Sequence, residues 1–177
     1  MWWRSDGGRG LGLGKTGRWH LVAGSTGAGK TTFARELAER VGGVRFSIDE
    51  WMTNLYWIDS PEKKDFAWAM ERIGRCETQM AATAEALARV GVDSVLDLGF
   101  TLREHRKKWM ELARAAGIEC ELHVLEIAAA TRWERVQERN RGASETYSFE
   151  VTREMFEFME QRWEMPDEGE RAGFFRG

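Results

Sequence analysis

Apolar and polar positions alternate along the chain in a way that predicts strands separated by helices. Short apolar runs, which are typical of buried strands, cover residues 19–23, 44–48, 92–98 and 120–127. Apolar residues at helical spacing predict helices at residues 32–41, 61–90, 102–116, 129–140 and 150–163. Strands that alternate with helices are typical of an α/β fold, in which helices flank a parallel sheet.

The longest predicted helix opens at Pro61, a position where the missing N–H of proline costs nothing, and ends before Gly91. Its predicted buried stripe consists of Phe66, Met70, Ile73, Met80, Ala84 and Leu87. This stripe predicts that the helix packs against the sheet.

A phosphate-binding motif lies between the first predicted strand and helix. It reads Gly24, Ser25, Thr26, Gly27, Ala28, Gly29, Lys30 and Thr31, which fits G-x-x-x-x-G-K-[ST] at every fixed position. Backbone N–H groups of the loop, continuing to Thr32, are expected to hold phosphates at the start of the helix. Lys30 would reach the β- and γ-phosphates, and the Thr31 hydroxyl would bind Mg²⁺. The motif predicts a protein that binds ATP and Mg²⁺.

Length, charge and cysteine content narrow the class of protein. A chain of 177 residues with a net charge of −3 predicts one domain without a global basic field, so nucleic acid is possible as a partner but not favoured. Cys76 and Cys120 are predicted to be buried apolar residues, and so low a cysteine content is typical of a reducing compartment such as the cytoplasm. No apolar run is as long as a membrane span, so we expect a protein without one, either a monomer or a homodimer. We expect a flexible leader at 1–18, the domain at 19–165 and a tail at 166–177.

Chemically versatile residues follow the predicted strands, where ligands of parallel sheets bind. Asp49 follows the second strand, Asp97 and Thr101 lie at and after the end of the third, and several arginines follow the fourth. These arginines are Arg132, Arg135, Arg139 and Arg141.

These features together resemble a known family. Gly24 to Thr31, Ile48-Asp49-Glu50, and Val95 to Thr101 followed by Arg103 and Arg106 are similar to the P-loop kinases of the polynucleotide kinase, zeta toxin and chloramphenicol phosphotransferase group. The resemblance covers about Trp19 to Glu164.

The resemblance implies a three-layer P-loop NTPase fold with a parallel sheet of four or five strands and a short helical lid. The phosphate-loop strand would lie between the third and fourth strands. It further implies that Asp49 takes the acceptor's proton or holds its hydroxyl, and that Arg132, Arg135 and Arg139 lie on a helix leading into the lid.

Two carboxylates are candidates for the chemistry. Phosphoryl transfer needs a carboxylate that orients the incoming hydroxyl, which favours Asp49 over a mere capping role, with Glu50 as an alternate. Asp97 has three open roles, which are a share of the Mg²⁺ shell, contact with the acceptor, and a structural hydrogen bond to the Thr101 loop. Thr101 is a candidate substrate contact, although capping of the next helix is favoured for it.

Arginines must neutralise charge on the transferring phosphoryl group. Arg132 and Arg139, with Lys30, are the predicted catalytic cations, Arg135 is a predicted nucleotide contact, and Arg141 belongs to a predicted lid at residues 140–146.

An aromatic-rich segment at residues 51–58 and the helix after it offer candidates for the acceptor pocket. Tyr56, Trp57, Trp68 and Arg72 are predicted substrate residues, whereas Trp51 and Phe66 are expected in the core. The predicted function is therefore transfer of the ATP γ-phosphate to a hydroxyl of a small molecule. A polynucleotide 5′-hydroxyl kinase and a nucleotide-binding ATPase switch are the alternatives.

Overall fold

A computed structural model describes residues 16–58, 60, 66–142 and 150–172. Its centre is a parallel sheet of four strands in the order β2-β3-β1-β4. The strands are β1 (Trp19–Ala23), β2 (Val44–Ser47), β3 (Ser94–Asp97) and β4 (Cys120–Val124). The strand before the phosphate loop, β1, therefore lies between β3 and β4, as the family resemblance implies.

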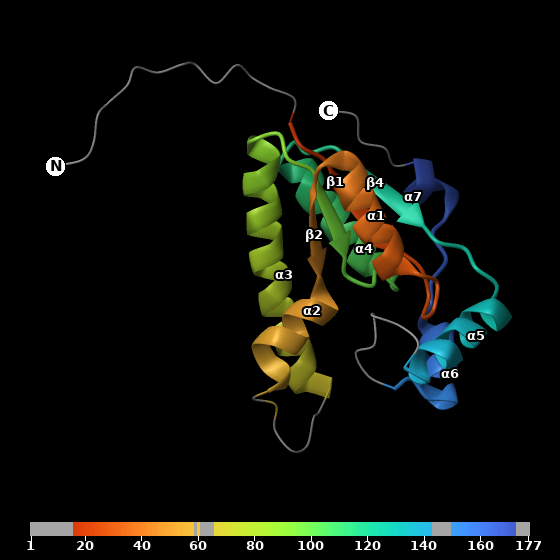
Figure 1. Cartoon of the computed structure of the whole chain (residues 1–177). Coiled ribbons are helices and arrows are strands. Elements are labelled where there is room, and N and C mark those ends of the chain that lie inside the picture. Colours follow the sequence, from red (N-terminus) through yellow and green to blue (C-terminus); the bar gives the residue numbers. More distant parts are fainter. Residues whose placement is uncertain (1–15, 59, 61–65, 143–149, 173–177) are drawn as a thin grey trace, which may run out of the picture.

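Helices cover both faces of this sheet (Figure 1). The helices that follow β1, precede β3 and follow β3 are α1 (Lys30–Val41), α3 (Phe66–Arg89) and α4 (Arg103–Ala115). Successive residues of a strand point to opposite faces. Accordingly Val22 packs under α1, whereas Trp19 and Leu21 belong to the larger core with α3 and α4. The result is the predicted three-layer α/β fold.

The remaining helices follow β2 and β4 in the chain. They are α2 (Ile48–Met52), which runs on into a π-helical turn (Thr53–Trp57), and α5 (Ala129–Asn140), α6 (Arg153–Arg162) and α7 (Glu168–Ala172). None of the described helices has the length and apolar character needed to cross a membrane.

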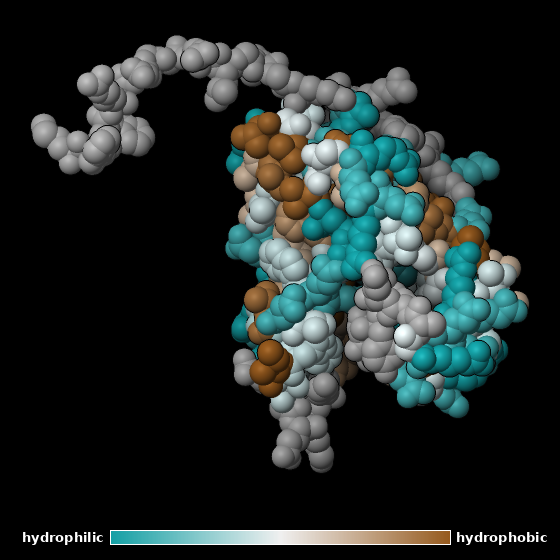
Figure 2. All heavy atoms as spheres, in the orientation of Figure 1, coloured by the Kyte–Doolittle hydropathy of each residue, from teal (hydrophilic) through white to brown (hydrophobic). Residues whose placement is uncertain are grey.

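The stripe predicted for the long helix is wrong at its beginning. Phe66 is 75% exposed and Met70 is also exposed, so Phe66 is not a core residue. Cys76, Met80, Ala84 and Ala88 form the buried face instead. Figure 2 shows hydrophobic patches on the α3 side of the surface.

The described part of the predicted tail contacts the domain through α7. Glu170 of α7 accepts hydrogen bonds from Nε and Nη2 of Arg106, at 2.7 and 3.1 Å, and Arg106 is fully buried. A buried guanidinium requires such a partner. Gly17 and Arg18, from the predicted leader, also bond to the body through Ala88 O and Asp93 Oδ1, and residues 1–15 lie outside the described part.

Candidate functional site

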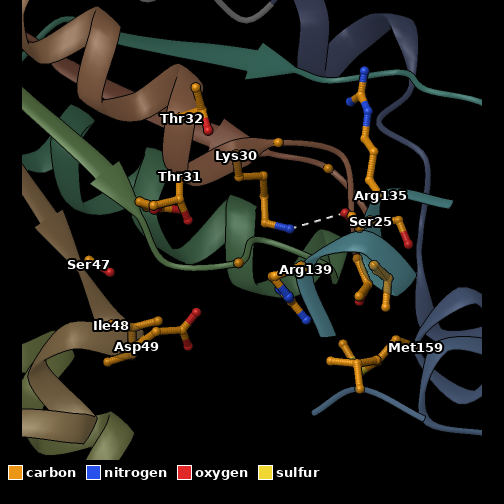
Figure 3. A pocket seen from close by; sticks show the side chains of 18 of the residues that line it. Ser25, Lys30, Thr31, Thr32, Ser47, Ile48, Asp49, Arg135, Arg139 and Met159 are labelled. Carbon is orange, nitrogen blue, oxygen red and sulfur yellow. Dashed lines mark hydrogen bonds between the residues drawn. The ribbon is translucent and has the colours of Figure 1, made fainter. Parts of the chain in front are cut away.

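The phosphate-binding motif forms a tight loop between β1 and α1. Gly27 and Gly29 have φ angles of 79° and 89°, in the left-handed region that favours glycine. Lys30 is the first residue of α1, and its Nζ donates a hydrogen bond to the carbonyl oxygen of Ser25 at 3.2 Å (Figure 3). The side chain of Lys30 thus crosses the loop and bonds to its backbone at the amino end of α1.

A pocket of about 1130 Å³ opens over this loop. The residues predicted to bind the nucleotide all line this pocket, except for Ala28, whose side chain is buried in the protein. Among the other predicted site residues, those that line the pocket are Asp49, Asp97, Thr101, Arg135 and Arg139. The structure therefore brings together residues from the phosphate loop, α1, α2, β3, the segment after β3, and α5.

Arg139 has the position expected of a phosphate ligand. In Figure 3 its side chain and that of Lys30 point toward one space, which Asp49 faces from the opposite side. The Nε of Arg139 is buried without a hydrogen-bond partner within the described residues. An unpaired buried donor is costly, and an anionic ligand in the pocket would satisfy it.

Arg135 lies nearer the start of α1. Its Nη1 is 3.8 Å from the position that a Cβ on Gly29 would occupy. Because the amino end of α1 carries a partial positive charge, a guanidinium there adds to an anion-binding surface. Arg141 is exposed, and residues 143–149 of the predicted lid lie outside the described part of the chain.

Arg132 does not line the pocket but holds the loop from behind. It donates hydrogen bonds to the carbonyl oxygens of Ile127 (2.8 Å) and Thr26 (3.1 Å), and it pairs with Glu160 of α6. Glu160 also accepts a 2.9 Å hydrogen bond from the Ser25 hydroxyl. This geometry corrects the expected phosphate contact, because the guanidinium is engaged by the loop, the start of α5 and α6.

The charges around Lys30 are unevenly compensated. Burial lowers the pKa of Lys30, whereas Asp97 and Asp49 raise it and Arg132 and Arg139 lower it further. Asp97 and Asp49 thus face Lys30 and Arg139, whereas Arg132 is paired with Glu160. Phosphate oxygens would add the negative charge that a buried ammonium lacks.

Asp49 and its neighbour Glu50 lie in the first turn of α2, and they differ in their partners. Ser47 caps this helix by accepting the Glu50 N–H, so Asp49 is not the capping residue. Glu50 pairs with Arg45 and Arg35. Although burial raises the pKa of Glu50, these guanidinium groups hold it below its usual value. Asp49 is therefore the better placed of the two to receive an incoming group.

Asp97 has a partner that the sequence did not indicate. It accepts a hydrogen bond from Arg45 of β2 at 3.1 Å. Burial raises the pKa of Asp97, and Lys30 and Arg45 oppose this shift. The hydrogen bond to the Thr101 loop was one of three roles considered for Asp97. Among the described residues, its hydrogen bond is to Arg45 of β2 instead.

Thr101 lines the pocket, and Leu102, not Thr101, occupies the capping position of α4. The carbonyl oxygen of Thr101 accepts a hydrogen bond from the Glu164 N–H. The capping role predicted for Thr101 is therefore wrong, and its place at the pocket agrees with the substrate contact considered for it.

The aromatic candidates form a separate group away from the pocket. Arg72 lies 4.2 Å above the ring of Trp68, Trp57 packs on Trp68 at 6.0 Å, and Tyr56 lies near Arg72. None of these four lines the pocket. Helical structure over residues 48–57 directs these aromatic rings toward the core cluster, where Trp51 also packs as expected.

One wall of the pocket was not predicted from the sequence. It comes from α6, whose residues Glu154, Met155, Phe158 and Met159 line the pocket. The spacing of Met155, Phe158 and Met159 by three and four residues predicts one apolar helical face. That spacing could not indicate which surface the face covers, because α6 reaches the phosphate loop only through tertiary contacts such as that of Glu160 with Ser25.

Solved structures share this arrangement of strands and helices. In the Pnkp1/Rnl/Hen1 RNA repair complex, one chain matches with a TM-score of 0.64 and 15% identity, over 86% of this chain and 45% of that one. Chaetomium thermophilum Kti12 in complex with ADP-AlF3 has a TM-score of 0.61 and 17% identity, with coverage of 84% and 81%. A gluconokinase from Sinorhizobium meliloti 1021 has a TM-score of 0.55 and 20% identity, over 87% of this chain and 78% of that one.

These likenesses identify the fold as that of P-loop NTPases, in agreement with the resemblance seen in the sequence. No curated protein sequence matches the chain. The family AAA_33, described as an AAA domain, matches residues 20–166, which cover β1 from His20 onward, the phosphate loop and every pocket residue named above. The chain therefore belongs to this family of AAA domains.

Proposed function

We propose that this protein is a kinase that moves the γ-phosphate of ATP to a hydroxyl group of a small molecule. The observation that carries the proposal is the continuity of one pocket from the phosphate loop to Asp49. A donor site and a carboxylate facing it are what in-line phosphoryl transfer requires.

In this proposal the cations of the pocket bind the triphosphate and Asp49 handles the acceptor. Lys30 contacts the β- and γ-phosphates, and Arg139 uses its unpaired Nε to hold oxygen atoms of the transferring group. Asp49 accepts the hydrogen of the attacking hydroxyl and aligns its oxygen with the phosphorus atom. The bond from phosphorus to the acceptor oxygen forms as the bond to the β-phosphate oxygen breaks, leaving ADP.

The residues beside Lys30 fit Mg²⁺. The Thr31 hydroxyl and the Asp97 carboxylate both line the pocket, and both are hard oxygen ligands of the kind Mg²⁺ prefers. When bound there, the ion would neutralise charge on the β- and γ-phosphates. Asp97 would act directly or through a bound water.

The test is a screen of hydroxyl compounds with γ-labelled ATP, followed by variants of the two neighbouring carboxylates. We expect label transfer to one class of compound, loss of transfer in Asp49→Asn with ATP affinity retained, and largely preserved transfer in the matched control Glu50→Gln. Label transfer at the wild-type rate by Asp49→Asn would reject the role of Asp49.

The same screen distinguishes the rival functions. Label on the 5′ end of an oligonucleotide, with binding that weakens steeply as salt increases, would support a polynucleotide kinase. Release of phosphate to water without any labelled acceptor would support an ATPase switch. Either outcome would overturn the proposed small-molecule acceptor.

A further inference from the structure

Two of the three histidines in the chain meet on the sheet, under α1 and apart from the pocket residues. His20 of β1 is paired in register with Glu121 of β4, and Val22 is paired with His123. Residues at alternate positions of a strand share a face, so the three polar side chains gather on the face that α1 covers. The ring of Phe33 from α1 packs against His123 at 5.5 Å.

The donor atoms of this group are as close as ligands of one metal ion. His20 Nδ1 lies 3.1 Å from His123 Nε2 and 3.6 Å from Glu121 Oε2, and His123 Nε2 lies 3.8 Å from the same carboxylate oxygen. Ligand atoms around a tetrahedral zinc ion with bonds of about 2.0–2.1 Å are separated by about 3.3–3.4 Å. The observed separations bracket that value.

Asp93 orients the most buried of these ligands. Its Oδ1 accepts the Arg18 N–H at 2.8 Å, and its Oδ2 lies 3.2 Å from His20 Nε2. Because a carboxylate only accepts, the hydrogen of a neutral His20 is placed on Nε2, and Nδ1 is left with a lone pair directed at His123 and Glu121. A carboxylate behind a histidine is the arrangement that commonly supports a metal-binding imidazole.

We propose that His20, His123 and Glu121 form a binding site for a divalent transition metal ion of the zinc type, with Asp93 as the group that positions His20. Two imidazoles and one carboxylate are a recognised zinc ligand set, and nitrogen ligands disfavour Mg²⁺. Asp93 and Glu121 supply two negative charges, and the described cation that acts electrostatically on His123 is Arg40. The bound ion would join β1 to β4 across the sheet.

The first test is titration of the chelator-stripped protein with Zn²⁺ against a chromophoric competitor, repeated with Co²⁺ to follow its absorption bands. The wild type should bind one equivalent. Asp93→Asn should bind about 10–100-fold more weakly, and His123→Gln more weakly still. His105→Gln is the matched control, since His105 lies on α4 and contacts Glu77. It should bind like the wild type.

The second test is thermal unfolding with and without Zn²⁺, which does not depend on phosphate transfer. Zn²⁺ should raise the Tm of the wild type and His105→Gln but not of His123→Gln. Circular dichroism of each metal-free variant shows whether it is folded, and Glu121→Gln replaces His123→Gln if the latter is not. Absence of stoichiometric binding by the wild type, or equal binding by His123→Gln and His105→Gln, would overturn the site.

Discussion

Two arginines on one helix, separated by seven positions, have different tasks. Arg139 lines the pocket with an unpaired Nε, whereas Arg132 is buried and bonded to the loop and to Glu160. Arg139→Ala should therefore reduce turnover strongly, by about 10³-fold if it stabilises the transferring group, with little change in stability. Steady-state kinetics and thermal melts measure the two effects.

Arg132→Ala should show the opposite balance. It leaves Glu160 and two carbonyl oxygens without their donor, so the free energy of unfolding should fall by about 1–3 kcal/mol. Urea unfolding measures this loss. An Arg132→Ala protein as stable as the wild type would show that these bonds do not hold the loop.

The carboxylate of Asp97 links stability to pH. Burial raises its pKa, so the ionised form opposes folding once the pH exceeds the folded-state pKa. Asp97→Asn should therefore raise the Tm near neutral pH, and the difference from the wild type should shrink as the pH falls and the carboxyl becomes protonated. Thermal melts across this range measure the difference. A lower Tm for Asp97→Asn at neutral pH would mean that its bond to Arg45 outweighs the cost of burial.

Residue identity predicts a site best where the chemistry is local. Lys30 and Thr31 follow from eight contiguous residues, and Asp49 follows from its position directly after a strand. The engagement of Arg132 with Glu160, and of Asp97 with Arg45, could not be predicted, because each joins segments that meet only in the folded chain. Tyr56 and Trp57 were predicted in the acceptor pocket, but they pack against the core and do not line the pocket over the phosphate loop. Residue type could not distinguish these two positions, because an aromatic ring fits a pocket and a core equally well.

At the scale of elements, α5 packs directly on the phosphate loop. A Cβ at Gly27 would lie 2.5 Å from the carbonyl oxygen of Arg132, whereas one at Gly29 would meet only the Nη1 of Arg135 at 3.8 Å. Both glycines have positive φ, which costs a substituted alanine about 1–3 kcal/mol. Gly27→Ala should lose more stability than Gly29→Ala, because α5 must also move. Equal losses in the free energy of unfolding, measured with urea, would show that α5 can move away from residue 27 at little cost.

Elements with a strong local pattern were predicted closely. Helix α5 covers the predicted residues 129–140, and the four strands appear where apolar runs occur. Helix α2 and the π-helical turn were missed, because residues 48–57 lack a helical period and are shaped by packing on the core. Phe66 was assigned to the core because periodicity alone does not show where a helix extends past the sheet.

At the scale of the whole molecule, the pocket joins both halves of the chain, so a bound nucleotide should stabilise the entire fold. At about 100 times its Kd, a nucleotide that binds only the folded state adds about 2.7 kcal/mol. For a domain of this size that corresponds to an increase in Tm of about 5–11 °C. Differential scanning fluorimetry with ATP and Mg²⁺ measures the shift.

Lys30→Met is the control for this measurement. It removes the ammonium that bonds to Ser25 and would contact the phosphates, so its Tm should respond weakly to ATP. A full shift in this variant would place the bound nucleotide somewhere other than the phosphate loop.

The bond between Ser25 and Glu160 spans 135 positions of the chain, and it has a consequence for synthesis. The phosphate loop leaves the ribosome long before the helix that steadies it, because 135 positions separate the two bonded residues. A nascent chain that has emerged only as far as α5 would carry the complete motif without its brace from α6. Competence to hold a nucleotide should therefore arise late, when almost the whole domain has been made.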